Sequence, residues 1–127
     1  MAFPPTRLMS FAEFERVADT QSGFRCELLH GELVQAPPPR HVHYMVQCRL
    51  QQVLSTAAGG ARIAGTEFPF RPLPEYEYWF ADVAFVSRER WDRIARNGNL
   101  QGAPQLVVEV LSLRPCGRNA RPKERLP

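Results

Sequence analysis

Hydrophobic and polar positions along this chain follow a helical period in some segments and a strand period in others, which predicts a mixed α/β fold. Ser10 and Glu13 form an S-x-x-E capping box, so we expect a helix that begins after Ser10. Two apolar runs then flank a His-Gly pair and predict a β-hairpin. These runs are Cys26–Leu29 and Glu32–Gln35.

The strongest helical pattern runs from His41 to Ala58, and the pair Gly59-Gly60 ends it in the usual way. We expect this helix to pack on the sheet. The apolar side chains that follow its period are Val42, Met45, Val46, Leu50, Val53, Leu54 and Ala57.

The second half of the chain is rich in branched and aromatic residues and predicts further strands. The elements expected there are a strand over Ala61–Phe70 that is interrupted at Gly65 and Pro69, a strand over Tyr78–Val86, a short helix capped by Ser87, and a strand over Leu106–Leu111. The order of elements favours a central mixed sheet flanked by helices.

Composition indicates one soluble globular domain, because 44% of the 127 residues are hydrophobic and 23% are charged. No apolar run approaches the roughly 18 residues of a membrane span. The three cysteines are widely spaced, which excludes a disulfide framework or zinc knuckle and fits a reducing cytoplasm. Residues 1–112 form the predicted domain, whereas residues 113–127 form a basic tail, rich in proline and arginine, that we expect to be disordered.

Two acidic residues interrupt strongly apolar strands, where an unpaired carboxylate would cost several kcal/mol. Asp82 follows Trp-Phe-Ala, and Glu109 follows Leu-Val-Val. On neighbouring strands they would make an oxygen-rich site suited to Mg²⁺ or Mn²⁺. The alternative is that both acids lie at strand ends and meet solvent or arginine, and the residues alone leave both interpretations open.

Four stretches between Ser10 and Ser112 resemble the Uma-two family of restriction-endonuclease-like proteins, a branch of the PD-(D/E)XK nuclease fold. No single stretch is specific, but their order and spacing are. They are Cys26-Glu-Leu-Leu-His-Gly-Glu-Leu-Val34, the proline-rich loop before His43, Ala81-Asp-Val-Ala-Phe-Val-Ser87, and Gly102-Ala-Pro-Gln-Leu-Val-Val-Glu-Val-Leu-Ser112.

The resemblance implies a metal-dependent endonuclease that hydrolyses DNA. Asp82 would match the aspartate of the PD motif and Glu109 the acid of (D/E)XK, and both would hold Mg²⁺ or Mn²⁺. Glu27 and His43 match recurring family positions near such a site. The alternative interpretation is a strand-end acid for Glu27 and a residue at the helix start that contacts backbone for His43. Glu67 is a further candidate acid. The resemblance also leaves a homodimer open.

The chain departs from the family pattern after Ser112, where the helix and final strand of the family are missing, as in a truncated member. Lys123 stands near the spacing of the family's catalytic lysine, but it follows Pro122, and we expect it not to do that lysine's work. Two other functions therefore stay open. One is an inactive remnant of such a nuclease, and the other is a module that binds nucleic acid through its basic tail.

Overall fold

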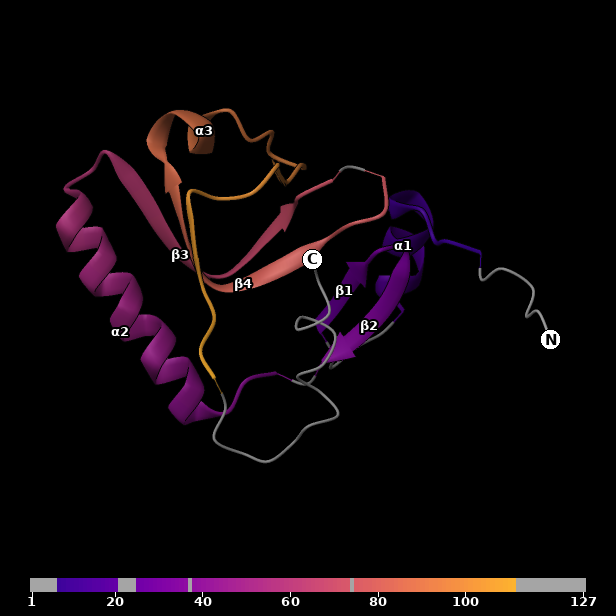
Figure 1. Cartoon of the computed structure of the whole chain (residues 1–127), viewed down its shortest axis with the longest axis horizontal. Coiled ribbons are helices and arrows are strands. Elements are labelled where there is room, and N and C mark those ends of the chain that lie inside the picture. The colour runs from indigo at the N-terminus through magenta and orange to yellow at the C-terminus, as the bar shows by residue number, and fades with distance from the viewer. Residues whose placement is uncertain (1–6, 21–24, 37, 74, 112–127) are drawn as a thin grey trace.

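A four-stranded mixed sheet forms the centre of the fold, and a two-stranded hairpin lies beside it (Figure 1). The structure is a computed structural model that describes residues 7–20, 25–36, 38–73 and 75–111. The elements in chain order are α1 (Phe11–Ala18), β1 (Arg25–Leu29), β2 (Glu32–Ala36), α2 (His41–Ala58), β3 (Arg62–Arg71), β4 (Trp79–Ser87), α3 (Arg88–Asp92), β5 (Leu100–Gln101) and β6 (Leu106–Val108).

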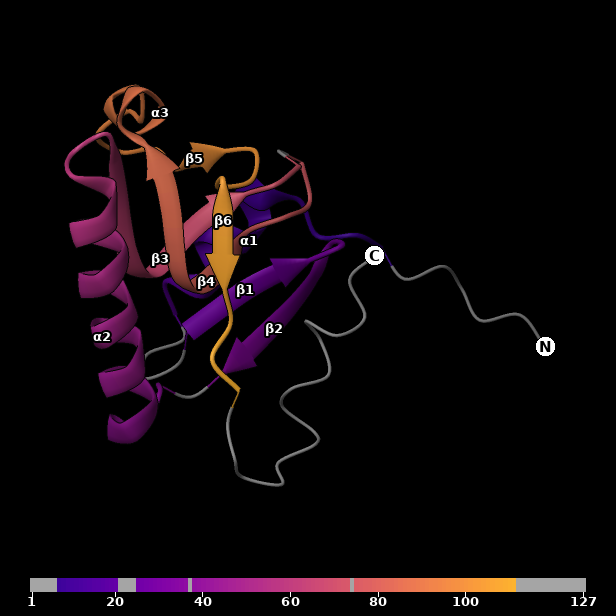
Figure 2. The same ribbon diagram turned by 60° about the vertical axis from the view of Figure 1, so that its left-hand side comes forward.

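The strand order of the central sheet is β5-β3-β4-β6. Strand β4 is antiparallel to both β3 and β6, whereas β5 is parallel to β3. Helix α2 runs along the sheet, and α3 lies beyond the end of β4 (Figure 2). The predicted α/β fold with a central mixed sheet flanked by helices is therefore confirmed.

An isolated backbone bridge joins the hairpin to the start of the central strand β4. Leu28 and Tyr78 exchange two N–H···O hydrogen bonds of 2.8 Å each, just before β4 begins. The ring of Tyr78 packs against Phe11 and Phe14 of α1, so the first helix covers this junction. Burial raises the pKa of the Tyr78 hydroxyl.

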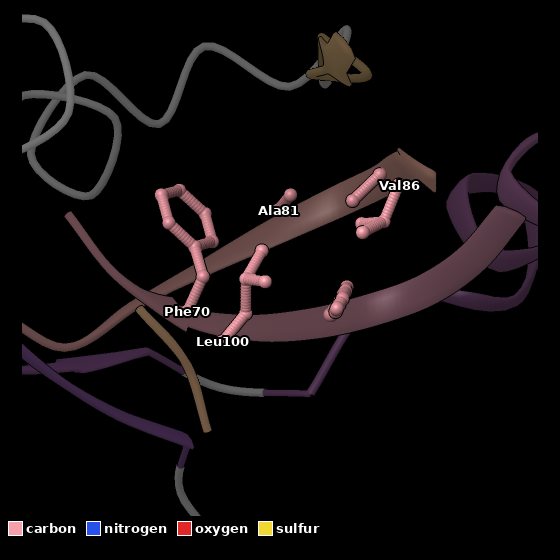
Figure 3. Close-up of a cluster of buried hydrophobic side chains, with 6 residues drawn as sticks. Phe70, Ala81, Val86 and Leu100 are labelled. Carbon is pink, nitrogen blue, oxygen red and sulfur yellow. The ribbon is translucent and has the colours of Figure 1, made fainter. Parts of the chain in front are cut away.

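The main hydrophobic core lies on the central sheet and takes residues from β3, β4 and β5. Phe70, Ala81, Val86 and Leu100 are four of its six buried members (Figure 3). Trp91 and the residues after it cover this core from α3, with the Trp91 ring 6.0 Å from that of Phe68. Among the described residues, no helix is both long and apolar enough to cross a membrane.

The capping and turn residues in the N-terminal half of the chain form the structures that the sequence predicts. The Ser10 hydroxyl accepts the N–H of Glu13 at 3.2 Å, and the Glu13 carboxylate accepts the N–H of Ser10 at 3.2 Å, which completes the capping box. The hairpin turns at His30-Gly31 between β1 and β2, and Gly59 ends α2 in the left-handed conformation with φ of 67°.

Three sequence expectations are wrong in detail. Strand β3 runs unbroken through Gly65 and Pro69, because both residues keep their partners on β4; its irregular residue is Glu67, with φ of 48°. Strand β6 ends at Val108 and does not reach Leu111.

The predicted tail over 113–127, including Lys123, lies outside the described residues.

The third correction concerns the inward face of α2. Its predicted apolar stripe is largely exposed, and the helix instead turns polar side chains toward the sheet: Gln47 is buried, and Gln51 donates to the Ala64 carbonyl oxygen at 3.0 Å. The exposed members of the stripe are Val42, Met45, Val46, Val53 and Ala57.

Replacing Gly31 by alanine should destabilise the fold. Gly31 has φ of 76°, and an added Cβ would lie 2.8 Å from the Leu8 Cβ. The left-handed conformation alone costs a non-glycine residue about 1–2 kcal/mol, and the overlap adds to it. Urea denaturation of Gly31→Ala should show a loss of about 2 kcal/mol or more. Gly65→Ala is the control, since no atom lies within 4 Å of the added Cβ; equal stability of the two variants would contradict the assignment.

The capping box should make stability depend on pH in the acid range. The backbone hydrogen bond from Ser10 lowers the pKa of Glu13 from its ordinary value. A carboxyl group with a lowered folded-state pKa contributes stability above its unfolded-state pKa and loses it as the pH falls through the folded-state pKa. Melting temperatures of wild type and Glu13→Gln should therefore converge as the pH falls from 6 to 3; parallel curves would exclude this contribution.

Candidate active site

Two acidic residues face each other on neighbouring strands, and a third follows the end of β6. The pairs Thr66–Val83 and Phe68–Ala81 enclose the position at which Glu67 of β3 faces Asp82 of β4. On the other side of β4, Val83 pairs with Val108, the last residue of β6, and Glu109 comes directly after it. Asp82 is therefore the acid of a central strand, with Glu67 on one neighbouring strand and Glu109 just beyond the end of the other.

Asp82 is buried, with only 6% of its surface exposed, in the middle of β4. Its Oδ2 atom accepts the backbone N–H of Val110 at 2.7 Å. Its Oδ1 atom accepts a longer bond of 3.2 Å from the side-chain amide of Gln47. The carboxylate is thus paired through both oxygens, and Oδ1 is the one held more loosely.

The Val110 contact explains why β6 is short. The N–H of Val110 bonds to Asp82, and its carbonyl oxygen lies 3.0 Å from His43 Nε2. Side chains therefore satisfy both backbone groups of Val110 in place of a strand partner. The chain leaves the sheet after Val108 as a result.

His43 reaches the site from the first turn of α2. Because a carbonyl oxygen only accepts, the contact with Val110 requires that Nε2 carries the proton. The same Nε2 lies 3.5 Å from Asp82 Oδ2. Nδ1 is buried and has no hydrogen-bond partner among the described residues. His43 thus does both things that the sequence left open: it contacts backbone, and it lies beside the candidate site.

Gln47 lies one helical turn after His43 and is completely buried. Its Nε2 donates to Glu67 Oε2 at 2.6 Å and to Asp82 Oδ1 at 3.2 Å, so a single amide group joins the two carboxylates. Its Oε1 is buried and has no hydrogen-bond partner within the described part of the chain. A buried, unpaired carbonyl oxygen is costly, which makes this atom notable.

Glu67 is held in a strained conformation between Gln47 and an arginine. Its φ of 48° is unusual for a residue with a side chain and costs about 1–3 kcal/mol. The guanidinium of Arg25, from the first residue of β1, forms an ion pair with Glu67 Oε1. Such strain persists only where the surroundings enforce it, and it concentrates at functional sites.

Glu109 and Glu27 differ from Asp82 in their surroundings. Glu109 lies one residue beyond the end of β6 and is exposed. Glu27 lies in the middle of β1, where it is 3% exposed and its Oε2 accepts the N–H of Phe80 at 2.8 Å. A strand-end position for Glu27 is therefore wrong, because this carboxylate is a buried partner for the backbone of β4.

The donor set around Asp82 suits a hard divalent cation, because its side chains offer carboxylate and amide oxygens and no thiolate. No three His, Cys, Asp or Glu side chains converge closely enough within residues 7–20, 25–36, 38–73 and 75–111 to form a ready metal centre. The shared ion between Asp82 and Glu109 stays a prediction, as does the role of Lys123.

Sequence reasoning missed Gln47 and left Glu67 as a minor candidate. A signal for Gln47 exists, since His43, Gln47 and Gln51 recur every four residues within a helix and so mark one polar face. Glu67 carries the same signal as Asp82, because it is an acid within an apolar strand.

Known proteins resemble this chain in sequence family and in fold. The model of the Uma2 family, described as "Putative restriction endonuclease", matches residues 11–114. No curated protein matches the chain. Among solved structures, the fold is similar to the crystal structure of "a putative nuclease belonging to DUF820" from Anabaena variabilis ATCC 29413, with a TM-score of 0.64 and 19% sequence identity. The similarity covers 82% of this chain and 59% of that protein, so the chain spans about three-fifths of its length.

Removing the Glu27 carboxylate should lower stability, because this buried group accepts the Phe80 N–H of β4 and that hydrogen bond would be lost. Such a loss costs about 1–3 kcal/mol. We expect urea denaturation to show this decrease for Glu27→Ala and a smaller one for Glu27→Gln, which keeps an acceptor oxygen. Glu89→Ala is the control, since this exposed glutamate pairs only with Arg93 on the surface of α3 in the described structure. Wild-type stability in Glu27→Ala would contradict the structural role.

Proposed function

The chain belongs to the Uma2 family of restriction-endonuclease-like proteins, and from this premise we propose that it is a metal-dependent nuclease that hydrolyses phosphodiester bonds of DNA at Asp82. The burial of Asp82 in a central strand, with Glu67 facing it and Glu109 just after the neighbouring strand, is the observation that carries the proposal. Carboxylates at this place would repel a phosphodiester, which is itself an anion. A cation between them and the phosphate removes that repulsion, so the acids favour a metal-dependent reaction.

Asp82 and Glu109 are the residues that would hold Mg²⁺ or Mn²⁺. Bound there, such an ion polarises the scissile phosphate and lowers the pKa of a water that attacks it. The requirement on the protein is that the Asp82 carboxylate is correctly aimed. The N–H of Val110 holds its Oδ2 atom in place at 2.7 Å.

His43 positions the loop that carries Glu109. Its Nε2–H holds the Val110 carbonyl oxygen, which belongs to the residue directly after Glu109. The Asp82 carboxylate holds the N–H of the same residue. Two side chains from different elements therefore fix the backbone beside Glu109, and this placement is what a cation shared by Asp82 and Glu109 needs.

DNA as substrate and a cytoplasmic location are the finer parts of this proposal. The first rests on family membership together with the acids at Asp82 and Glu67, and cleavage of DNA by the purified chain tests it directly. The second rests on the widely spaced cysteines, which fit a reducing compartment.

Asp82→Asn should abolish cleavage. A bound divalent ion supplies several kcal/mol of transition-state stabilisation, and each 1.36 kcal/mol is a factor of ten in rate. We therefore expect at least about a 100-fold loss of plasmid nicking in Mg²⁺ or Mn²⁺. The measurement is an agarose-gel time course at fixed protein concentration, with and without EDTA.

Asp92→Asn is the matched control, because Asp92 is exposed at the end of α3. It should nick DNA at the wild-type rate, and circular dichroism should show Asp82→Asn folded. Glu109→Gln serves as a second variant should Asp82→Asn fail to fold. Metal-dependent nicking that persists in both site variants would overturn the assignment, as would absence of nicking by the wild-type chain.

A further inference from the structure

The buried amide of Gln47 lies where two carboxylates converge, and the geometry points to a divalent-cation site there. We propose that Glu67, Asp82 and the Oε1 atom of Gln47 together bind a divalent cation on the α2 side of Asp82. The cation takes the place that the Gln47 amide N–H₂ group fills in the structure described here. This inference rests on the proposed function for its catalytic meaning, but its test does not.

Oδ1 is the oxygen of Asp82 that is more available to a cation. Oδ2 is committed to the Val110 N–H at 2.7 Å and lies near His43. Oδ1 has only the 3.2 Å bond from Gln47. A cation that approaches Asp82 with least disturbance therefore meets Oδ1, which faces Glu67 and not the loop that carries Glu109.

In the absence of a cation, the Gln47 amide joins the two carboxylates. Its Nε2 bonds to Glu67 Oε2 at 2.6 Å and to Asp82 Oδ1 at 3.2 Å. An amide N–H₂ group carries partial positive charge and two hydrogens, so it satisfies two convergent carboxylates. It thereby occupies the position that suits a cation.

The oxygen of the same amide has a different environment. Gln47 Oε1 is buried and unpaired within the described structure, and the whole residue is 0% exposed. The last side-chain torsion of glutamine is broad and roughly two-fold. A half-turn about it exchanges Nε2 for Oε1, which presents a third oxygen to the two carboxylates and moves Nε2 to the buried position that Oε1 leaves.

The three donors are all oxygens, the ligands that Mg²⁺, Mn²⁺ and Ca²⁺ prefer. Because one of the three is an amide, the site contains only two acidic ligands and differs from a cluster of three acids. Arg25 holds Glu67 Oε1 and leaves Oε2 directed at Gln47. The guanidinium also offsets one of the two negative charges, so a divalent cation would not leave the site strongly anionic.

The experiment measures Mn²⁺ affinity by isothermal titration calorimetry with manganese chloride as the only ligand. Glu67→Gln should weaken binding at least about tenfold, since even the loss of residues that merely support a ligand costs 10–100-fold. Glu89→Gln, an exposed carboxylate on α3, is the control and should bind as wild type does.

Gln47→Glu should instead raise the affinity for Mn²⁺. It places a carboxylate oxygen at the site without any need for the amide to turn, and it removes the donor that joins Glu67 and Asp82 in the cation-free protein. We expect at least about tenfold tighter Mn²⁺ binding, a lower melting temperature without metal, and recovery of that temperature when Mn²⁺ is added. Gln52→Glu makes the same substitution at an exposed position of α2 and should change none of these.

The outcomes separate this inference from the proposed function. Glu67-dependent Mn²⁺ binding in a chain that cuts no DNA supports the site and refutes the nuclease. DNA cleavage that requires Asp82, together with Mn²⁺ affinity within about twofold of wild type in Glu67→Gln, supports the nuclease and overturns the site. Absence of Mn²⁺ binding by wild type at millimolar concentration also overturns the site, whatever the cleavage assay shows.

Discussion

Much of this structure depends on the need to satisfy one buried carboxylate. Asp82 lies in the middle of a central strand, where removal from water would cost several kcal/mol without hydrogen-bond partners. The donors come from two different elements, Gln47 of α2 and the backbone of Val110 after β6. Satisfying Asp82 therefore determines which face α2 turns toward the sheet and where β6 ends.

This constraint explains why the bounds of α2 were predictable from the sequence and its orientation was not. The helix occupies residues 41–58, as its apolar period and Gly59 indicate. Hydrophobicity then suggests that Val42, Met45 and Val46 face inward, and these residues are exposed. The sheet surface beneath α2 carries Glu67 and Asp82, so polar side chains are the better partners. A pattern within one helix contains no information about the charge of the surface on which it packs.

The same reasoning accounts for the different surroundings of Asp82 and Glu109. Both acids interrupt apolar runs, and that local signal correctly places their strands side by side. Whether each acid is buried depends on long-range contacts. The bonds from Asp82 and His43 to Val110 draw the chain out of the sheet, and Glu109 consequently lies beyond the strand end. The strain at Glu67 was equally invisible, because φ of 48° follows from tertiary contacts with Arg25 and Gln47 and not from any turn residue.

The two oxygens of Asp82 have different roles, one structural and one chemical. Oδ2 fixes the chain after β6 through the short bond to Val110, and Oδ1 accepts the longer bond from an amide that has a second orientation open to it. An asparagine at this position would keep one oxygen, and that oxygen would accept the Val110 N–H, which makes the shorter of the two bonds. Its amide nitrogen would then face the Gln47 Nε2, and two donors would meet. A half-turn of the Gln47 amide would end that conflict but would bring its Oε1 against Glu67 Oε2, the acceptor that Gln47 now bonds at 2.6 Å. The neutral side chain therefore removes the anionic oxygen that a cation requires and also disturbs the link between Gln47 and Glu67.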